Sequence, residues 1–173
     1  LNGGYGSKVF VEEPGVFMNN EMDDFSSNPG VRNMFGLFGN EANSIVPKKR
    51  MLSSMTPTIV EKNGALYMVV GTPGGSTIIT SVFQTILNVY EHDLPIQEAV
   101  NAPRFHHQWL PDYITFEPKQ FDAELLKKLN DLGYAAEEKR SRIIGKVDAI
   151  LIDDASVITL GADPRGDDTA VNY

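Results

Sequence analysis

The sequence predicts an α+β fold in which helices cover antiparallel hairpins, and a hairpin signal and a helical periodicity are the observations behind this prediction. Residues 56–61 and 65–71 are rich in β-branched and apolar side chains, and they flank the pair Asn63-Gly64. Asn-Gly between two such runs is the strongest short signal of a β-hairpin. Because residues 65–71 are almost all apolar, we expect both faces of this strand to be covered.

A helix is predicted directly after this hairpin, over residues 77–90. Its apolar side chains are spaced three and four positions apart, which places them on one helical face. They are Ile78, Ile79, Val82, Phe83, Ile86 and Leu87. Ser76 has the side chain of a good N-cap, so we expect the helix to begin there.

Shorter signals predict the remaining elements. We expect a helix at 96–101 after Pro95, a strand at 114–117, a helix at 122–132 that Gly133 ends, a hairpin from 147–152 and 157–160, and a polar loop at 163–168.

Length and composition limit the classes of function. A chain of 173 residues is the length of one domain, so we expect a single domain over 1–173, with a lid-like or flexible loop at 26–50. A net charge of −8 repels phosphate backbones, which argues against a nucleic-acid partner. The sequence has no cysteine, which excludes disulfides and a cysteine nucleophile. No apolar run approaches the ~20 residues of a membrane span.

The segment Gly71–Ser76 joins a predicted buried strand to a helix N-terminus. The adjacent Gly74 and Gly75 would let backbone N–H groups approach a ligand with no Cβ in the way. The helix dipole adds partial positive charge there, so such a turn can bind an anion or a developing oxyanion. The alternative is a tight turn that needs glycine only for its shape.

Two further segments place polar groups in an apolar context. Ser53 and Ser54 stand at the entry to a predicted strand, where they could donate to a carboxylate or else bond to nearby backbone. Residues 18–25 hold three carboxylates, Glu21 and Asp24 among them, and two amides. These groups could hold an ammonium group or a hard cation, although they do not match the EF-hand pattern. A solvated acidic loop is the alternative.

The histidines do not indicate a metal site. His106 and His107 are adjacent, and neighbouring side chains on a strand point to opposite faces, so they are poor joint ligands. No acid or third histidine is spaced to complete a zinc site. We expect structural roles for both histidines, and no metal or organic cofactor.

Together these segments predict an amino-acid head group as the ligand. Hydroxyls would bind its carboxylate, acidic groups its ammonium, and the glycine amides an oxyanion formed at a carbonyl further along the molecule. Such a set of groups indicates acyl transfer. A nucleophile is missing from this picture, because no serine lies in a G-x-S-x-G context and Leu1 offers no nucleophilic side chain.

The chain resembles the small subunit of the gamma-glutamyltranspeptidases, members of the N-terminal nucleophile hydrolase superfamily. The resemblance runs along the whole chain. The matching segments are Leu1-Asn2, Gly6, residues 20–25, 52–58, 71–76 and 101–111 (NAPRFHHQWLP), and Asp163-Pro164-Arg165.

The resemblance implies a four-layer αββα sandwich and an activity on gamma-glutamyl amides such as glutathione, whose glutamyl group is transferred to water, an amino acid or a peptide. It also assigns roles to residues of this sequence. The alpha-amino contacts fall on Asn2, Glu21 and Asp24, the alpha-carboxylate contacts on Ser53 and Ser54, and the oxyanion-hole amides on Gly74 and Gly75.

One departure concerns the nucleophile, which in the family is a threonine exposed by autocleavage of a precursor. No residue here matches it, so we expect a small subunit truncated before that threonine and inactive alone. The resemblance further implies a large subunit from the same precursor as partner, no cofactor, and a periplasmic or extracellular location. A non-catalytic amino-acid-binding module and a poly-gamma-glutamate-processing homologue remain alternatives.

Overall fold

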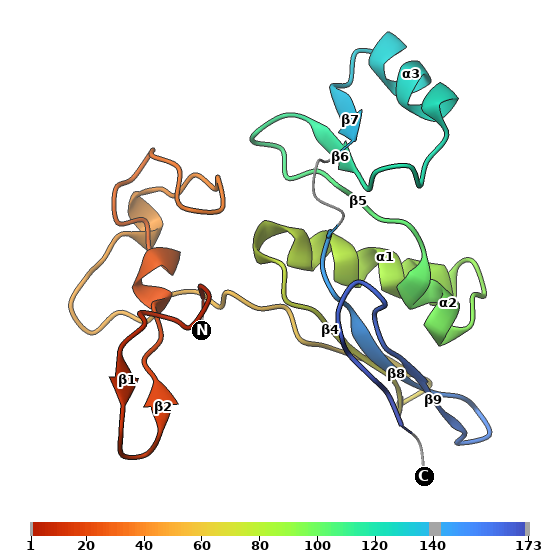
Figure 1. Ribbon diagram of the computed structural model, residues 1–173, viewed down its shortest axis with the longest axis horizontal. Coiled ribbons are helices and arrows are strands. Elements are labelled where there is room, and N and C mark those ends of the chain that lie inside the picture. Colours follow the sequence, from red (N-terminus) through yellow and green to blue (C-terminus); the bar gives the residue numbers. More distant parts are fainter. Residues whose placement is uncertain (1, 139–142, 172–173) are drawn as a thin grey trace. The chain divides into compact units, whose positions relative to one another are not determined.

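The computed structural model describes residues 2–138 and 143–171, and the chain divides into two compact units (Figure 1). They are Leu1–Ser54 and Met55–Tyr173, and each is described by itself. The single domain expected over 1–173 stays a prediction.

The first unit holds a short hairpin and two 3₁₀ turns. Strands β1 (Phe10–Val11) and β2 (Val16–Phe17) pair antiparallel, and turns η1 (Glu21–Asp24) and η2 (Glu41–Asn43) follow. The hairpin was not predicted, because two-residue strands carry no readable alternation of side chains. Its aromatic rings pack on one another, with 5.2 Å between the centroids of Phe10 and Phe17.

Residues 26–50 form a loop that is ordered by local hydrogen bonds. The Asn33 side-chain oxygen accepts from the N–H groups of Phe35 and Leu37, both at 3.0 Å, as Asx turns do. Isolated bridges join Ser26 to Ser44 and Arg32 to Phe38. The loop therefore has a defined conformation, while its function as a lid stays a prediction.

The second unit is built on a four-stranded antiparallel sheet in the order β3-β4-β8-β9 (Figure 1). Its strands are β3 (Thr58–Lys62), β4 (Ala65–Gly71), β8 (Asp148–Ile152) and β9 (Ile158–Gly161). Both predicted hairpins are confirmed. Asn63 and Gly64 have φ of 54° and 79°, the left-handed pair that a two-residue hairpin turn requires.

Helices α1 (Ile78–Tyr90) and α2 (Ile96–Asn101) cover one face of this sheet (Figure 1). The core between them contains Met68, Val70, Val82, Val100 and Val147, among other residues. The positions of both helices agree with the sequence prediction.

The predicted apolar stripe of α1 is partly wrong. Ile79 and Phe83 are 66% and 58% exposed, whereas Ser81 and Thr85 are buried. These hydroxyls can be buried because each is satisfied, Thr85 by the carbonyl of Ser81 at 3.0 Å, and Ser81 by that of Ile144 at 3.2 Å. The buried face of α1 is therefore determined by its contacts with the rest of the unit and not by apolar spacing alone.

The predicted N-cap at Ser76 is also wrong. A 3₁₀ turn, η3 (Gly75–Thr77), precedes the helix, and Ser76 lies within it. Thr77 occupies the N-cap position of α1 without a capping side-chain hydrogen bond.

The other face of the sheet is apolar but exposed within this chain, so the expectation that both faces of β4 are covered is wrong here. Ile59, Val69, Ile150 and Leu160 are aligned by strand register into one row across the four strands. Val69 and Ile150 are 36% and 42% exposed, because both helices lie on the opposite face. A hollow of about 630 Å³ is lined in part by Val69, Ile150 and Leu160 of this row.

A second, three-stranded sheet has the order β5-β6-β7, with strands β5 (Phe105–His106), β6 (Ile114–Phe116) and β7 (Ala136–Glu138). Helix α3 (Ala123–Asp131) connects β6 to β7, which run parallel. The Asp122 side chain caps α3 by accepting from the Glu124 N–H at 2.9 Å. The sequence predicted β6 and α3, but the short polar β7 gave no strand signal.

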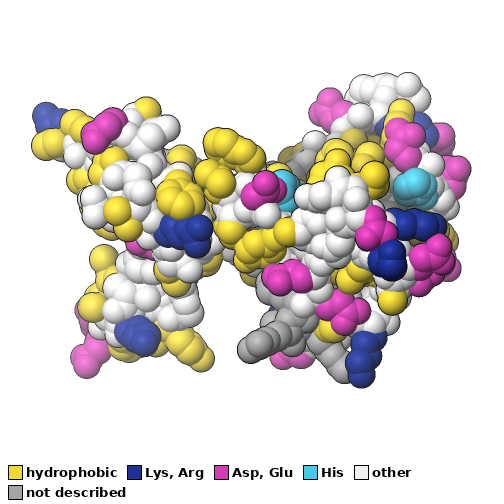
Figure 2. All heavy atoms as spheres, turned by 90° about the horizontal axis from the view of Figure 1, so that it is seen from above, with side chains coloured by type: hydrophobic (Ala, Val, Ile, Leu, Met, Phe, Trp, Pro, Cys, Tyr) yellow, Lys and Arg dark blue, Asp and Glu magenta, His cyan; other side chains and the backbone are white. Residues whose placement is uncertain are grey.

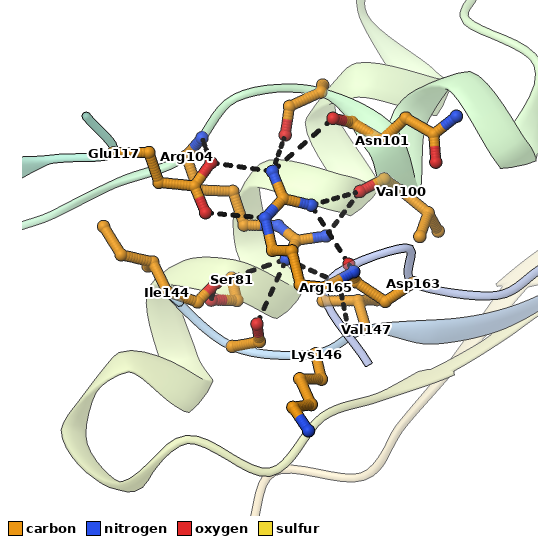
Figure 3. A network of polar contacts seen from close by, with 12 residues as sticks. Ser81, Val100, Asn101, Arg104, Glu117, Ile144, Lys146, Val147, Asp163 and Arg165 are labelled. Atoms are coloured by element: carbon orange, nitrogen blue, oxygen red, sulfur yellow. Dashed lines mark hydrogen bonds and ion pairs between the residues drawn. The ribbon is translucent and has the colours of Figure 1, made fainter. Parts of the chain in front are cut away.

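The tail at 163–168 is a loop with no helix or strand, as predicted, but part of it is buried. Asp163 is 1% exposed, and it and Arg165 enter a network of buried charges with Arg104 and Glu117 (Figure 3). Composition did not reveal this burial, because these charges are neutralised by partners distant in the sequence.

Candidate functional site

The residues predicted for an oxyanion site lie where β4 is joined to η3, in a segment that ends on the first residue of η3 and that we call the glycine turn (residues 72–75). Gly74 and Gly75 have φ of 152° and 59°, both in the region that favours glycine. A Cβ on Gly74 would lie 2.7 Å from Thr77 Oγ1 and 3.2 Å from the Cα of Gly145. Glycine is therefore required at position 74 by conformation and by close packing together.

The backbone amides of the glycine turn are available to a ligand. In the described part of the chain, the N–H groups of Gly74 and Gly75 donate no hydrogen bond to another residue. They precede the N-terminus of α1, where the helix dipole adds partial positive charge. Such paired donors can stabilise an oxyanion that develops at a reacting carbonyl.

The first unit brings three of the predicted head-group residues together, Glu21, Asp24 and Ser54, which we call the acidic cluster. Glu21 and Asp24 stand at the two ends of η1 and share a side-chain hydrogen bond. Ser54 Oγ donates to Glu21 Oε2 at 2.9 Å. The hydroxyl expected to bind a carboxylate and the carboxylate expected to bind an ammonium are thus direct neighbours.

The two carboxyls of the acidic cluster have pKa values displaced in opposite directions. Burial, together with the hydrogen bond and charge of Glu21, raises the pKa of Asp24 to about 6. The same hydrogen bond from Asp24 lowers the pKa of Glu21. The pair therefore keeps one proton to higher pH than isolated carboxyls would, and that proton resides on Asp24.

Several buried polar atoms near this cluster lack a partner in the described residues. They are Asn2 Nδ2, Asp23 Oδ2, Asp24 Oδ2 and Ser26 Oγ. Asp23, Asp24 and Ser26 line a cavity of about 340 Å³ within this unit. Unpartnered carboxylate oxygens in a cavity can bind an ammonium group. Asp23 was not among the predicted site residues, although it belongs to the acidic run that drew attention to its neighbours.

The other two predicted head-group residues are Ser53 and Asn2. Ser53 is exposed beside Ser54. Asn2 has its side-chain nitrogen buried without a partner, and no hydrogen bond joins it to Glu21 or Asp24. The five head-group residues lie in the first unit and the glycine turn in the second, so the two sets are described separately.

His106 and His107 are held by hydrogen bonds to neighbouring side chains. His106 is buried, with Nδ1 2.8 Å from Thr80 Oγ1 and Nε2 2.8 Å from Gln108 Oε1. His107 is exposed, and its Nε2 lies 3.1 Å from Asp112 Oδ1. Among residues 2–138 and 143–171, no group of three His, Asp or Glu side chains could hold a metal ion.

The buried charge network lies near the glycine turn and was not predicted. Arg104 is 1% exposed and donates to Asp163 Oδ2 at 2.7 Å and to the Ile144 carbonyl at 3.2 Å (Figure 3). Arg165 forms a two-pronged ion pair with Glu117, at 2.6 and 2.7 Å. The only signal in the sequence was the presence of two arginines and two acids, Arg104, Arg165, Glu117 and Asp163, in segments interpreted as loops or strand ends.

Opposing effects act on the ionisation of Asp163. Burial disfavours its charged form, but hydrogen bonds from the Arg165 and Val147 N–H groups and from Arg104 outweigh burial and lower its pKa. Burial also disfavours the charged form of Arg104, and for this cationic group the effect lowers the pKa.

Known structures define the class of fold. A cephalosporin acylase from Bacillus halodurans, 25% identical, matches 95% of this chain with a TM-score of 0.80 over 29% of its own length. A highly active mutant of the gamma-glutamyltranspeptidase from Pseudomonas nitroreducens, 43% identical, matches 99% of this chain and 89% of its own with a TM-score of 0.88. The chain has the α+β fold of N-terminal nucleophile hydrolases, as the sequence predicted.

Sequence comparison narrows this class to a family. The family model Gamma-glutamyltranspeptidase matches residues 1–173. The glutathione hydrolase proenzyme of Escherichia coli (strain K12) is 44% identical over 174 residues, which cover 100% of this chain and 30% of the proenzyme. That of Pseudomonas aeruginosa is 45% identical over 170 residues. The chain belongs to the gamma-glutamyltranspeptidase family, and it spans about 30% of the length of these relatives.

Proposed function

We propose that this chain is the small-subunit part of a gamma-glutamyltransferase, which moves a gamma-glutamyl group from glutathione or a related amide to water or an acceptor amine. The observation that carries the proposal is the glycine turn, whose two amide N–H groups have no partner in the described residues. Membership of a family whose relatives include glutathione hydrolase proenzymes supports it.

The proposal assigns head-group recognition to the first unit. Asn2, Glu21 and Asp24 bind the substrate's alpha-ammonium, and Ser53 and Ser54 bind its alpha-carboxylate. The buried, unpartnered Asp24 Oδ2 supports the first assignment. For the second, the Ser54 hydroxyl would turn from Glu21 to the substrate carboxylate.

The reaction needs a nucleophile that lies outside this sequence. In the complete enzyme, a threonine hydroxyl attacks the gamma-carbonyl carbon while its own alpha-amine accepts the proton. The Gly74 and Gly75 N–H groups stabilise the oxyanion, the amide C–N bond breaks, and the leaving amine takes the proton. Water or an acceptor amine then attacks the gamma-glutamyl ester and releases the threonine.

A pair of substitutions at Gly75, made in the complete processed protein, tests this role. Gly75→Pro removes the amide donor and also distorts the turn, because proline cannot adopt a φ of 59°, whereas Gly75→Ala keeps the donor with a smaller strain. Because the oxyanion forms only in the transition state, kcat of Gly75→Pro should fall about 10²–10³-fold below that of Gly75→Ala, with KM little changed.

The readout is turnover of a gamma-glutamyl anilide. A rise in KM at constant kcat would mean that the turn binds ground-state substrate instead. A parent protein that binds gamma-glutamyl compounds without turnover would replace the proposal by the non-catalytic amino-acid-binding module.

We further propose that the large-subunit part of the same precursor packs on the exposed apolar row of Ile59, Val69, Ile150 and Leu160. The relatives are named proenzymes, and this chain spans only part of them, which supports a second part as partner. No helix in the described residues is long and apolar enough to cross a membrane. A periplasmic or extracellular location, expected from the family alone, can be checked by cell fractionation.

A further inference from the structure

We propose that two threonine hydroxyls, those of Thr72 and Thr77, orient the two oxyanion-binding amides by holding the carbonyls of the same peptide groups. The inference rests on the proposed oxyanion role of Gly74 and Gly75. It makes both threonines positioning residues, because neither needs to touch the substrate.

The first amide belongs to the peptide group between Pro73 and Gly74. The Thr72 hydroxyl donates to the Pro73 carbonyl at 2.6 Å. Because this peptide bond is trans and planar, its N–H points opposite to its C=O. Fixing the Pro73 oxygen therefore fixes the direction of the Gly74 N–H, which points away from Thr72.

The second amide is controlled in the same way. The Gly74 carbonyl shares a planar peptide group with the Gly75 N–H. It accepts from Thr77 Oγ1 at 2.9 Å and from the Thr77 backbone N–H at 3.2 Å. Thr77 thus sets the Gly75 N–H with two hydrogen bonds, of which only one comes from its side chain.

Thr72 is itself locked by a segment distant in sequence. Its Oγ1 accepts from the Lys146 N–H at 2.6 Å, so the single hydroxyl proton is left for Pro73. The segment containing Lys146 is held on either side, by Arg104 at the Ile144 carbonyl and by Asp163 Oδ2 at the Val147 N–H, 2.7 Å (Figure 3). Both threonines are buried, so water does not compete for these bonds.

The two glycines make these threonine hydrogen bonds, which we call locks, necessary. A residue without Cβ has little steric preference for one peptide orientation, so a pair of glycines could turn their amides away from the substrate at low cost. Stabilisation of an oxyanion depends on donors that are oriented before the reaction. The asymmetry of the two locks predicts that Thr72, whose carbonyl partner has no second donor among the described residues, matters more than Thr77.

The test compares isosteric variants of the complete processed enzyme. Thr72→Val removes the hydroxyl and should lower kcat for a gamma-glutamyl anilide about 10-fold or more, as a misdirected donor costs less than a deleted one. KM should stay within about 3-fold, because the amides act on the oxyanion. Thr77→Val should lower kcat less, and Thr72→Ser and Thr77→Ser, which keep the hydroxyl, should restore it.

Thr85→Val is the matched control, since Thr85 is equally buried in this unit but bonds only within α1, to Ser81. It should leave kcat unchanged even if it lowers the melting temperature. A second readout is inhibition by a gamma-boronate analogue of glutamate, whose tetrahedral anion needs the amides. Thr72→Val should weaken this inhibition far more than it raises KM.

The outcomes separate the two proposals. Suppose that the parent turns over substrate and that Gly75→Pro lowers kcat. If Thr72→Val and Thr77→Val then keep their kcat, or if Thr85→Val lowers kcat as much as they do, the orienting role is wrong and the oxyanion role stands. A parent without turnover overturns both. Should Thr72→Val not mature, the comparison of Thr77→Val with Thr77→Ser decides the matter.

Discussion

At the scale of single residues, the two carboxyls of the acidic cluster, Glu21 and Asp24, have unequal affinity for one proton. Asp24 keeps its proton up to a pH of about 6, because its charged form is buried beside Glu21. A bound ammonium group would compensate that charge and expel the proton. Substrate binding and ionisation of Asp24 are therefore linked under the proposed function.

This linkage predicts a pH dependence of kcat/KM in the complete enzyme. Below a pH of about 6, Asp24 becomes neutral and loses its attraction for the alpha-ammonium, so kcat/KM for a gamma-glutamyl anilide should fall as the pH falls. The limiting slope is about tenfold per pH unit for a single group.

The control is a glutaryl anilide, which lacks the alpha-amino group and should show no such fall in this range. Asp24→Asn should abolish the pH dependence for the gamma-glutamyl substrate as well. Equal pH profiles for the two substrates would contradict contact between Asp24 and the ammonium.

At the scale of elements, the segment after β9 connects parts of the second unit through buried charges. Asp163 accepts from Arg104, from the Val147 N–H, and from Arg165. Arg165 reaches in turn to Glu117, just after β6. Residues 163–165 are therefore fixed by specific bonds to the segments that follow α2 and β6 and to the residue that precedes β8.

Asp163→Asn should destabilise the protein by about 3–5 kcal/mol, because it leaves the Arg104 guanidinium buried without its counter-charge. The pKa of Asp163 is lowered in the folded state, so its stabilisation is complete above the carboxyl's ordinary pKa and is lost as the pH falls.

The matched control is Asp131→Asn, whose partner Lys127 is exposed. That change should cost only about 0.3–0.5 kcal/mol. Chemical unfolding of both variants measures the difference between their free energies of unfolding. Similar losses in the two variants would show that the buried Arg104–Asp163 pair contributes no more to stability than the exposed pair does.

At the scale of the whole molecule, exposed apolar side chains are the prominent feature. Hydrophobic residues lie on the visible surface of both units in the space-filling view (Figure 2). On the sheet, they are aligned by register into one row rather than scattered. A contiguous apolar surface of this kind is typical of a buried interface.

Val69→Asp should therefore prevent assembly with the rest of the precursor, because a carboxylate would be buried in an apolar interface without a partner. The second unit should still fold, since Val69 faces away from its core. The measurement is the yield of two-part enzyme in size-exclusion chromatography after expression of the full precursor.

Leu132→Asp is the control, because Leu132 is 75% exposed beyond the end of α3 and outside the row. Normal assembly of Val69→Asp, or equal loss in Leu132→Asp, would contradict the proposed interface.

The sequence by itself determined the local structure and the family. The Asn63-Gly64 pair specified a hairpin because only residues that tolerate positive φ form its turn. Helical spacing placed α1 correctly, Pro95 marked the start of α2, and Asp122 marked the start of α3. Each of these signals lies within a few residues of the structure that it predicts. The roles of Gly74, Gly75 and the five head-group residues remain proposals that the structure supports unequally.

The tertiary structure alone decided which polar groups are buried. It turned Ile79 and Phe83 outward and Ser81 and Thr85 inward, contrary to apolar spacing. It also buried Asp163 against Arg104, 59 positions away. A polar side chain can be buried only where a partner satisfies it, and such partners come from segments far apart in the chain. No local pattern carries that information, which is why the locks on the glycine turn became visible only in three dimensions.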